Sequence, residues 1–136
     1  MDLPDRLDAP DMLARLDGLS PELLDELPFG VIGFDAEGLI RRYNRYEVTC
    51  AHFAAADVMG QHVFEELAPC FNNYLVAGVF DDAQATGAPL DHSMPYVLTF
   101  RMKPTACALR LLAPASQNQG EGLRYVLVDR AQAAQA

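Results

Sequence analysis

The stretch FGVIGFDAEGLIRRYN, residues 29–44, is the strongest structural signal in the sequence. Its first part, FGVIGF, is rich in β-branched and aromatic residues, and its last part, LIRRYN, has the composition of a second strand. The intervening AEG supplies a turn in which Gly38 can adopt a positive φ. The stretch therefore predicts a β-hairpin. Gly30 and Gly33 resemble a phosphate-binding glycine loop, but no helix N-terminus follows them, so we reject that interpretation.

Downstream of the hairpin, the pattern of apolar residues predicts the remainder of an α+β domain. Short helical segments are expected at 45–53, 54–60 and 63–67, and a longer helical pattern over 74–87 is ended by Gly87 and Pro89. Three further strands are expected at 90–102, 106–113 and 123–130, separated by a turn and by the polar loop 114–122. We therefore predict a five-stranded antiparallel sheet with helices covering one face.

Upstream of the hairpin, residues 1–27 predict a short helical N-terminal cap. They carry an intermittent stripe of leucine and methionine, followed by Ser20 as a helix N-cap and Pro21 at the first helical position. We expect this cap to precede a core of residues 28–130 and a flexible tail of residues 131–136.

The composition excludes several classes of function. A chain of 136 residues with 51% hydrophobic residues can bury one core, and its formal net charge of −9 disfavours nucleic acid and anionic membranes as partners. The sequence contains no apolar run of about 20 residues that would span a bilayer, and its first residues are acidic, unlike a secretory signal. We expect a cytoplasmic protein.

The three cysteines do not form a disulfide framework or a CxxC-type metal motif. Cys50 and Cys107 lie in apolar contexts, which favours buried, inert thiols. Cys70, in LAPCFNN, follows Pro69 and precedes an expected helix whose amides would favour a thiolate. From these residues alone, Cys70 can be a packing residue, a metal ligand, a nucleophile or an attachment point.

The histidines indicate neither catalysis nor metal binding. His52, His62 and His92 lie in polar contexts, and their spacing matches no pattern of metal ligands, so we expect surface or rim positions and no metal. Tyr43 and Glu47 are more informative, because a strand end and the first turn of a helix can direct both side chains into one pocket. For that pair alone, a half-exposed tyrosine and a solvated glutamate remain the alternative.

Three stretches together are similar to a known family. LPFGVIGFDAEGLIRRYNRYE (27–47), VMGQHVFEELAPC (58–70) and YVLTFRMKPT (96–105) resemble the photoactive yellow protein family, blue-light receptors with the PAS fold. The resemblance covers residues 27–130 and needs no gap between positions 43 and 70. It implies a PAS-fold photoreceptor, a sensory signalling protein rather than an enzyme.

The resemblance also implies a chromophore and the residues that hold it. It implies p-coumaric (4-hydroxycinnamic) acid bound as a thioester to Cys70, although a recombinant sample can be the empty apoprotein. Tyr43 and a protonated Glu47 match the residues that donate hydrogen bonds to the chromophore phenolate, and these are strong, charge-assisted bonds. Met102 matches a methionine that assists the thermal return to trans. The remaining pocket positions implied are Ala51, Phe53, Val63, Leu67 and Leu98.

By resemblance, the mechanism is a photocycle. Blue light drives trans-to-cis isomerisation, Glu47 gives a proton to the phenolate, and the newly ionised carboxylate causes partial unfolding in which the cap loosens. The resemblance does not name the downstream signalling protein.

The chain departs from the family at several pocket positions. Ala51 stands where a threonine hydrogen-bonds the pocket tyrosine, which leaves Thr49 or Cys50 as substitutes. Phe53 replaces a shielding arginine, Leu98 replaces an aromatic residue, and the FNN after Cys70 is unlike the usual loop.

Two other functions remain open at this point. One is a PAS sensory or interaction module that binds another small ligand or none. The other is an acyl-transfer enzyme that uses Cys70 as nucleophile, for which the sequence marks out no histidine partner.

Overall fold

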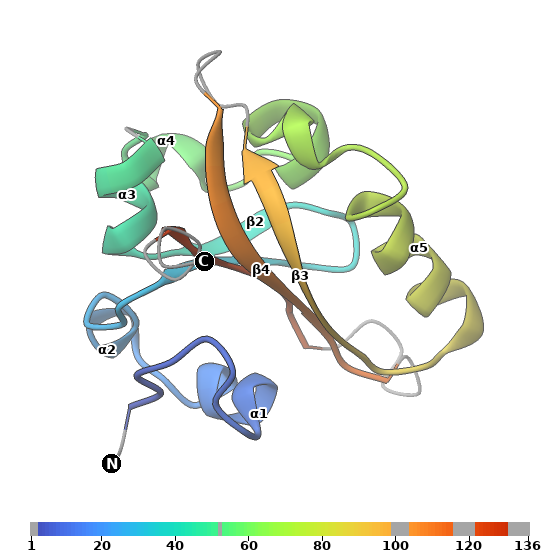
Figure 1. The fold of residues 1–136 in the computed structure, drawn as a ribbon, viewed down its shortest axis with the longest axis horizontal. Coiled ribbons are helices and arrows are strands. Elements are labelled where there is room, and N and C mark those ends of the chain that lie inside the picture. The colour runs from blue at the N-terminus through green and yellow to red at the C-terminus, as the bar shows by residue number, and fades with distance from the viewer. Residues whose placement is uncertain (1–2, 52, 99–103, 116–121, 131–136) are drawn as a thin grey trace.

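A five-stranded antiparallel sheet forms the centre of the protein (Figure 1). The computed structural model describes residues 3–51, 53–98, 104–115 and 122–130. The strands lie in the order β2-β1-β5-β4-β3, with bounds of Gly30–Phe34 (β1), Ile40–Tyr43 (β2), Leu90–Leu98 (β3), Thr105–Ala113 (β4) and Arg124–Asp129 (β5). The expected α+β fold with five antiparallel strands is confirmed.

The hairpin at residues 29–44 forms as its sequence predicts. β1 and β2 pair antiparallel, with Ile32 opposite Tyr43 and an irregularity between Gly33 and Phe34. In the turn, the carboxylate of Asp35 accepts hydrogen bonds from the amides of Glu37 and Leu39, and Gly38 has a φ of 87°. An aspartate that bonds the backbone two residues ahead is a common way to begin a tight turn.

Short helices connect the hairpin to β3, largely where the sequence predicts them. They are α3 (Arg45–Ala51), α4 (Ala55–Val58), the π-helical turn η1 (Val63–Leu67), the 3₁₀ turn η2 (Pro69–Phe71) and α5 (Ala77–Thr86). Gly87, with a φ of 77°, ends α5 as expected. The start of α5 differs from the expectation, because residues 74–76 precede the helix rather than form part of it.

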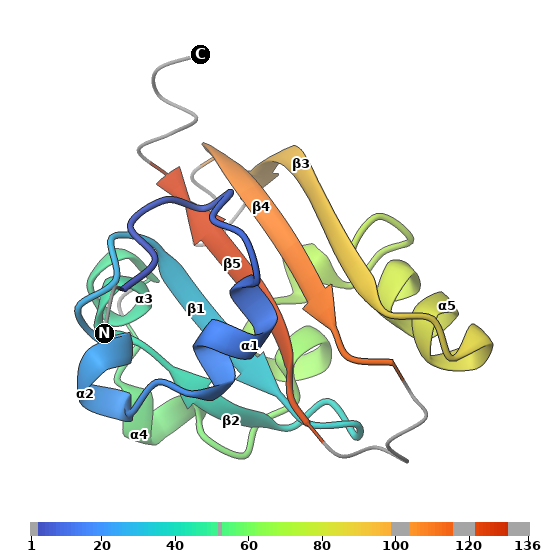
Figure 2. The ribbon, with the colours of Figure 1, turned by 90° about the horizontal axis from the view of Figure 1, so that it is seen from below.

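Both faces of the sheet are covered (Figure 2). On one face, β-strand residues such as Val126 and Val128 pack with η1, η2 and α5 in the main core. On the other face, Tyr125 and Leu127 pack against the N-terminal helices α1 (Met12–Asp17) and α2 (Pro21–Leu24). We expected helices over one face, but the leucine stripe of the cap buries itself against the second, as alternating apolar residues of β5 permit.

Arg42 fastens the cap to the sheet. One guanidinium nitrogen donates to the carbonyl of Leu16 at 2.7 Å and to the Tyr125 hydroxyl at 3.1 Å, and the other nitrogen donates to the carbonyl of Leu19. The Tyr125 hydroxyl in turn donates to Asp17 at 2.8 Å. These bonds tie the Leu16 carbonyl in the last turn of α1, which also accepts from the Leu19 amide, and the Leu19 carbonyl just beyond the helix to β2 and β5.

We expect Arg42→Met to lower the free energy of unfolding by about 2–4 kcal/mol, because hydrogen bonds from a charged donor to buried acceptors are lost. Arg41→Met is the matched control, since Arg41 is exposed and pairs with Asp35 at the surface, and we expect it to lower the free energy of unfolding by under about 0.5 kcal/mol. Urea denaturation measures both. Equal effects of the two variants would contradict the assignment of Arg42 as the fastening residue.

Candidate functional site

Asn44 connects the strand that carries Tyr43 to the helix that carries Glu47. Its amide oxygen accepts from the amides of Val31 at 2.9 Å and Glu47 at 3.4 Å, and its amide nitrogen donates to the carbonyls of Leu24 and Phe29, both at 3.0 Å. Asn44 is fully buried, so these bonds are shielded from water. The first turn of α3 is thereby fixed against β1.

Glu47 is fully buried, with a relative exposure of 0%. It lies so close to β1 that a Cβ atom on Gly30 would come within 2.0 Å of its Oε1 atom. The absence of a side chain at Gly30 therefore makes room for the Glu47 carboxylate, and a phosphate-binding loop is not needed to explain this glycine. The solvated glutamate that we kept as an alternative is wrong.

Arg130, directly after β5, forms an ion pair with this carboxylate. Its Nη1 atom donates to Glu47 Oε1 at 2.8 Å and its Nη2 atom to Oε2 at 3.5 Å, and the two side chains are 14% and 1% exposed. Because Arg130 carries a positive charge, this pairing is that of an ionised carboxylate. It differs from the protonated Glu47 that the resemblance implies for the chromophore-bound protein.

Arg130 is itself held in place by Tyr46 of α3. The backbone amide of Arg130 donates to the Tyr46 hydroxyl at 3.0 Å, and the guanidinium carbon lies 5.6 Å from the centre of the Tyr46 ring. Burial by itself lowers the pKa of Arg130, but the hydrogen bond and the charge of Glu47 outweigh burial and raise it. The cation is thus secured at the end of β5.

Tyr43 lies beside this pair and is 6% exposed. Its hydroxyl donates to the backbone carbonyl of Glu47 at 3.5 Å, the outer limit for a hydrogen bond. Burial, followed by the charge of Glu47, raises the pKa of Tyr43, so the hydroxyl keeps its proton. Thr49 is exposed and does not take the place of the family threonine, while Ala51 is buried as a small apolar residue.

Cys70 lies in η2 and is half-buried. The Tyr96 hydroxyl donates to the Cys70 carbonyl at 2.5 Å, and the side-chain amide of Asn73 donates to both the Tyr96 hydroxyl and the same carbonyl, at 2.7 and 3.2 Å. The oxygen of Asn73 accepts from the amides of Leu75 and Val76. We expected Cys70 to precede a helix directly, but α5 begins only at Ala77, and Asn73 orders the intervening turn instead.

Cys107 connects Cys70 with the ion pair. It is buried on β4, and burial raises the pKa of its thiol to about 12. Arg130, Glu47 and Cys70 also influence the pKa of this thiol, and Cys70 packs against the core in which Cys107 is buried. The prediction of a buried thiol is confirmed for Cys107. It is wrong for Cys50, which is exposed because α3 turns Glu47 and Ala51 inward.

The apolar residues expected to line the pocket differ in how deeply they are buried. That they contact a chromophore stays a prediction. Val63, Leu67 and Leu98 are buried in the main core, and Phe53 is half-buried against it. Met102 lies outside the described residues, as does His52. Of the other histidines, His92 is exposed, whereas His62 is half-buried and its Nδ1 atom accepts from the amides of Phe64 and Glu65 at the start of η1.

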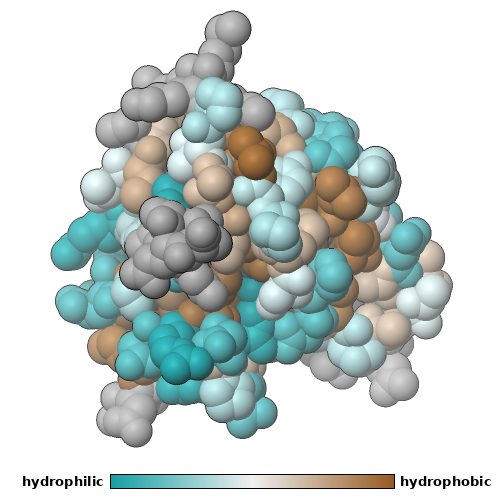
Figure 3. All heavy atoms as spheres, viewed as in Figure 1, coloured by the Kyte–Doolittle hydropathy of each residue, from teal (hydrophilic) through white to brown (hydrophobic). Residues whose placement is uncertain are grey.

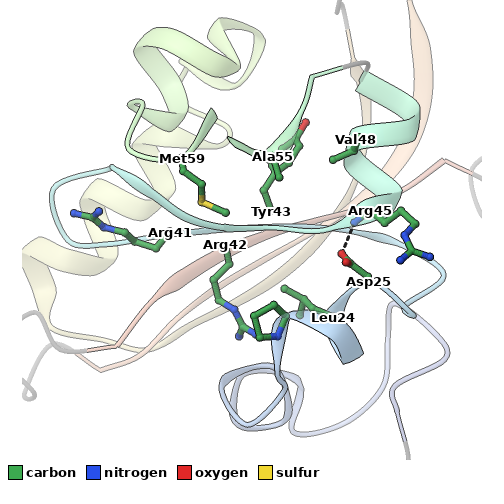
Figure 4. Close-up of a pocket in the computed structure, with 10 residues that line it drawn as sticks. Leu24, Asp25, Arg41, Arg42, Tyr43, Arg45, Val48, Ala55 and Met59 are labelled. Atoms are coloured by element: carbon green, nitrogen blue, oxygen red, sulfur yellow. Dashed lines mark hydrogen bonds between the residues drawn. The ribbon is translucent and has the colours of Figure 1, made fainter. Parts of the chain in front are cut away.

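A cavity of about 450 Å³ opens between the cap and the core (Figure 4). Its lining comes from α2, β2, α3 and α4 and includes Leu24, Tyr43 and Met59. Figure 4 shows Tyr43 and Arg42 leaving β2 on opposite sides. Tyr43 therefore lies between this cavity and the ion pair, while Glu47 and Cys70 are not among its described lining residues.

Other classes of site find little support in the described parts of the chain. Among those residues, no group of three or more His, Cys, Asp or Glu side chains lies close enough together to hold a metal ion. No helix there is long and apolar enough to cross a membrane. Figure 3 shows a face on which hydrophilic and hydrophobic residues are interspersed.

Sequence reasoning missed three residues of this region. Arg130 could have been noticed as a cation directly after the apolar strand YVLVD, and Asn73 as a turn residue three positions after Cys70. Tyr96 carried no comparable local signal, because a tyrosine in an edge strand is common. These residues supply the partners of Glu47 and Cys70.

Comparisons with known proteins agree with the fold and with the resemblance. The chain is 34% identical over 95 residues to the photoactive yellow protein of Halochromatium salexigens, covering 70% of this chain and 75% of the relative. It is 38% identical over 80 residues to that of Cereibacter sphaeroides, covering 59% of this chain and 61% of the relative. No family model matches the chain.

Solved structures give the same picture. The photoactive yellow protein domain of the sensor histidine kinase Ppr from Rhodospirillum centenum superposes with a TM-score of 0.75 at 30% identity, covering 85% of this chain and 96% of that domain. The PAS domain of an HTR-like protein from Haloarcula marismortui has a TM-score of 0.54 at 16% identity, over 90% and 98% of the two chains. The second likeness supports the PAS fold alone.

We expect Gly30→Ala to displace the Glu47 carboxylate and to lower the free energy of unfolding by about 1–3 kcal/mol, because the added methyl group overlaps Oε1. Gly78→Ala is the control, because a Cβ atom there meets its neighbours at 3.5 Å or more. Since alanine favours a helix over glycine, this substitution should raise the free energy of unfolding by up to about 1 kcal/mol. Thermal unfolding of both variants measures the difference. A stable Gly30→Ala protein would contradict the position of Glu47.

We also expect the native thiols to react at very different rates with iodoacetamide at pH 8. Cys50 is exposed, whereas Cys107 is buried with a pKa near 12, so Cys107 should be labelled at least about a hundredfold more slowly. Peptide mass spectrometry resolves the sites, and labelling in guanidinium chloride is the control in which the difference disappears. Equal native rates would show that Cys107 is not buried.

Proposed function

Since these comparisons establish that the chain belongs to the photoactive yellow protein family, we propose that it is a blue-light photoreceptor that carries p-coumaric (4-hydroxycinnamic) acid as a thioester on Cys70. The observation that carries the proposal is geometric: Tyr43, which hydrogen-bonds the Glu47 carbonyl, is buried in the main core, and Cys70 packs against that same core. Cys70 is half-buried, in contrast to the buried Cys107.

The residues present fit a phenolic group. Tyr43 has a buried hydroxyl whose hydrogen bond to the Glu47 carbonyl is long, at 3.5 Å, so it is able to donate a shorter bond to a ligand oxygen. Glu47 supplies a second buried group that can hold or release a proton at Oε1 or Oε2. The buried side chains of Val63, Leu67 and Leu98 belong to the apolar core of the same domain.

Attachment requires an activated acyl donor, such as an acyl thioester or an anhydride. The Cys70 Sγ atom forms a bond to the acyl carbon, the bond from that carbon to the leaving group breaks, and the leaving group departs with the electron pair as a thiolate or carboxylate. The thiol proton passes to solvent. Tyr96 and Asn73 hold the Cys70 carbonyl, and therefore orient the backbone from which Sγ projects.

The bound group supplies absorption of blue light and the trans-to-cis isomerisation. Glu47 holds a proton at its carboxylate before illumination and gives it up afterwards, which places a charge in a buried site. The cap of residues 1–27 is the element that responds by loosening. Hydrogen bonds from Arg42, Asn44 and Arg110 and one apolar cluster hold it to the rest of the domain. Asn44 also accepts from the Glu47 amide. Met102 assists the return to the starting state. The protein acts as a cytoplasmic sensor rather than an enzyme, and signals to a separate protein.

A second candidate function is a PAS sensory or interaction module without a phenolic ligand. The observation that favours it is the pair of Glu47 with Arg130, which satisfies the buried carboxylate without any ligand. The two functions differ in one property, namely whether Cys70 takes up the acyl group.

We expect the purified chain, treated with p-coumaric anhydride, to gain the mass of one acyl group and a visible band that bleaches under blue light and recovers in the dark. Cys70→Ala should abolish the band, and the acyl group should be absent from its peptide containing residue 70. Cys50→Ala should keep the band and lose only acyl mass taken up at that exposed thiol on α3. Mass and absorption spectra give the result. Acylation of Cys70→Ala to the same extent as the wild type would show that Cys70 is not the attachment site, and a wild type without a band favours the second function.

A further inference from the structure

The buried cation at the end of β5 has no role in the function proposed so far. Arg130 is placed by the Tyr46 hydroxyl, which accepts from its backbone amide at 3.0 Å, and by contact with the Tyr46 ring. Its side chain is 14% exposed and donates to the carboxylate of Glu47, whose side chain is 1% exposed. A pair buried to this degree is costly to form, and removal of either partner leaves an uncompensated charge.

The charges around this pair come from several elements. Besides Glu47 and Arg130, the titratable groups that face this region are Tyr43 on β2, Tyr46 and Cys50 on α3, Cys70 in η2, Cys107 on β4 and Asp129 on β5. Burial raises the pKa of the tyrosines and of Cys107, so these groups are neutral near pH 7. Among the described residues, Arg130 is the cation that contacts Glu47.

A phenol that approaches Glu47 brings one ionisable proton into this region. Glu47 either leaves the proton on the phenol and stays ionised, or takes it and becomes neutral while the phenol oxygen becomes anionic. Both arrangements contain the same number of protons and one negative charge in total. A fixed positive charge therefore balances the site in either arrangement, as it balances Glu47 alone in the ligand-free chain.

We propose that Arg130 is the counter-cation of the ligand site, a positioning residue that balances one negative charge whether that charge lies on Glu47 or on the phenolic oxygen of the ligand. This inference rests on the proposed function and assigns a residue to it. It also gives the ionised Glu47 of the illuminated protein a partner, because the pair between Glu47 and Arg130 can form again once the proton has left the carboxylate. The position of Arg130 after β5 would then depend on whether Glu47 is ionised.

The first arm of the test uses the ligand-free protein and measures unfolding by urea for Glu47→Gln, Arg130→Met and the double variant. We expect the equilibrium constant of unfolding to rise more than tenfold for Arg130→Met, and the double variant to recover most of that loss, since it removes both charges. Arg6→Met is the control, because Arg6 pairs with Asp8 at the exposed surface. Strictly additive effects of the two substitutions would overturn the buried pair.

The second arm uses protein acylated with p-coumaric anhydride and follows the visible band of the phenolate as a function of pH. Without the cation, the phenolate is less favourable, so the pKa of the chromophore phenol should rise. In Arg130→Met, the pH midpoint for loss of the band should therefore rise by at least one unit, which is a tenfold decrease in the acid dissociation constant. Arg130→Lys, which keeps the charge, should stay closer to the wild type, and the double variant covers the case in which Arg130→Met does not fold. The midpoint of Arg6→Met should equal that of the wild type.

The outcomes separate the two proposals. A wild type that gains no acyl mass overturns the proposed function, and with it the part of this inference that concerns the ligand. A wild type that is acylated and yellow, with a midpoint of Arg130→Met equal to that of the wild type and a midpoint of the double variant equal to that of Glu47→Gln, overturns the role of Arg130 alone. A raised midpoint in Arg130→Met that Arg130→Lys largely restores supports it.

Discussion

The ion pair between Glu47 and Arg130 is the constraint on which the arrangement of this site depends. It joins the first turn of α3 to the end of β5, two segments 83 residues apart in the chain, through a bond of 2.8 Å. Gly30 on β1 leaves the space that the carboxylate occupies. Buried ion pairs contribute little net stability compared with apolar packing. A carboxylate kept at this position is therefore better explained by proton chemistry than by folding.

The same region is continuous with the cap. Asn44 binds the carbonyl of Leu24 at the end of α2 and the amide of Glu47 in α3, while Arg42, two residues earlier, binds the carbonyl of Leu16 in α1 and that of Leu19 just after it. Two residues at the end of β2 and directly after it thus hold both helices of the cap. A single residue, Asn44, therefore connects Glu47 to the cap that is proposed to loosen.

Local features of the fold were predictable, and long-range partners were not. The hairpin at residues 29–44 and the end of α5 at Gly87 follow from strand composition and from glycine at positive φ, which act over a few residues. The exposure of Cys50 was mispredicted, because an apolar context does not determine which side of a short helix faces the core. The partner of Glu47 follows only from the pairing of β1 with β5, which brings Arg130 to α3. The resemblance placed Cys70, Tyr43 and Glu47, but not this cation.

The charge state of Glu47 in the ligand-free protein tests the account most directly. Infrared spectra of the apoprotein and its Glu47→Gln variant, recorded at neutral pH, isolate the absorption of this one side chain. The ion pair predicts that the difference spectrum contains the two stretching bands of a carboxylate and lacks the carbonyl band of a protonated acid. A protonated-acid band assigned to Glu47 in the ligand-free protein would contradict the pair with Arg130 and the counter-cation role derived from it.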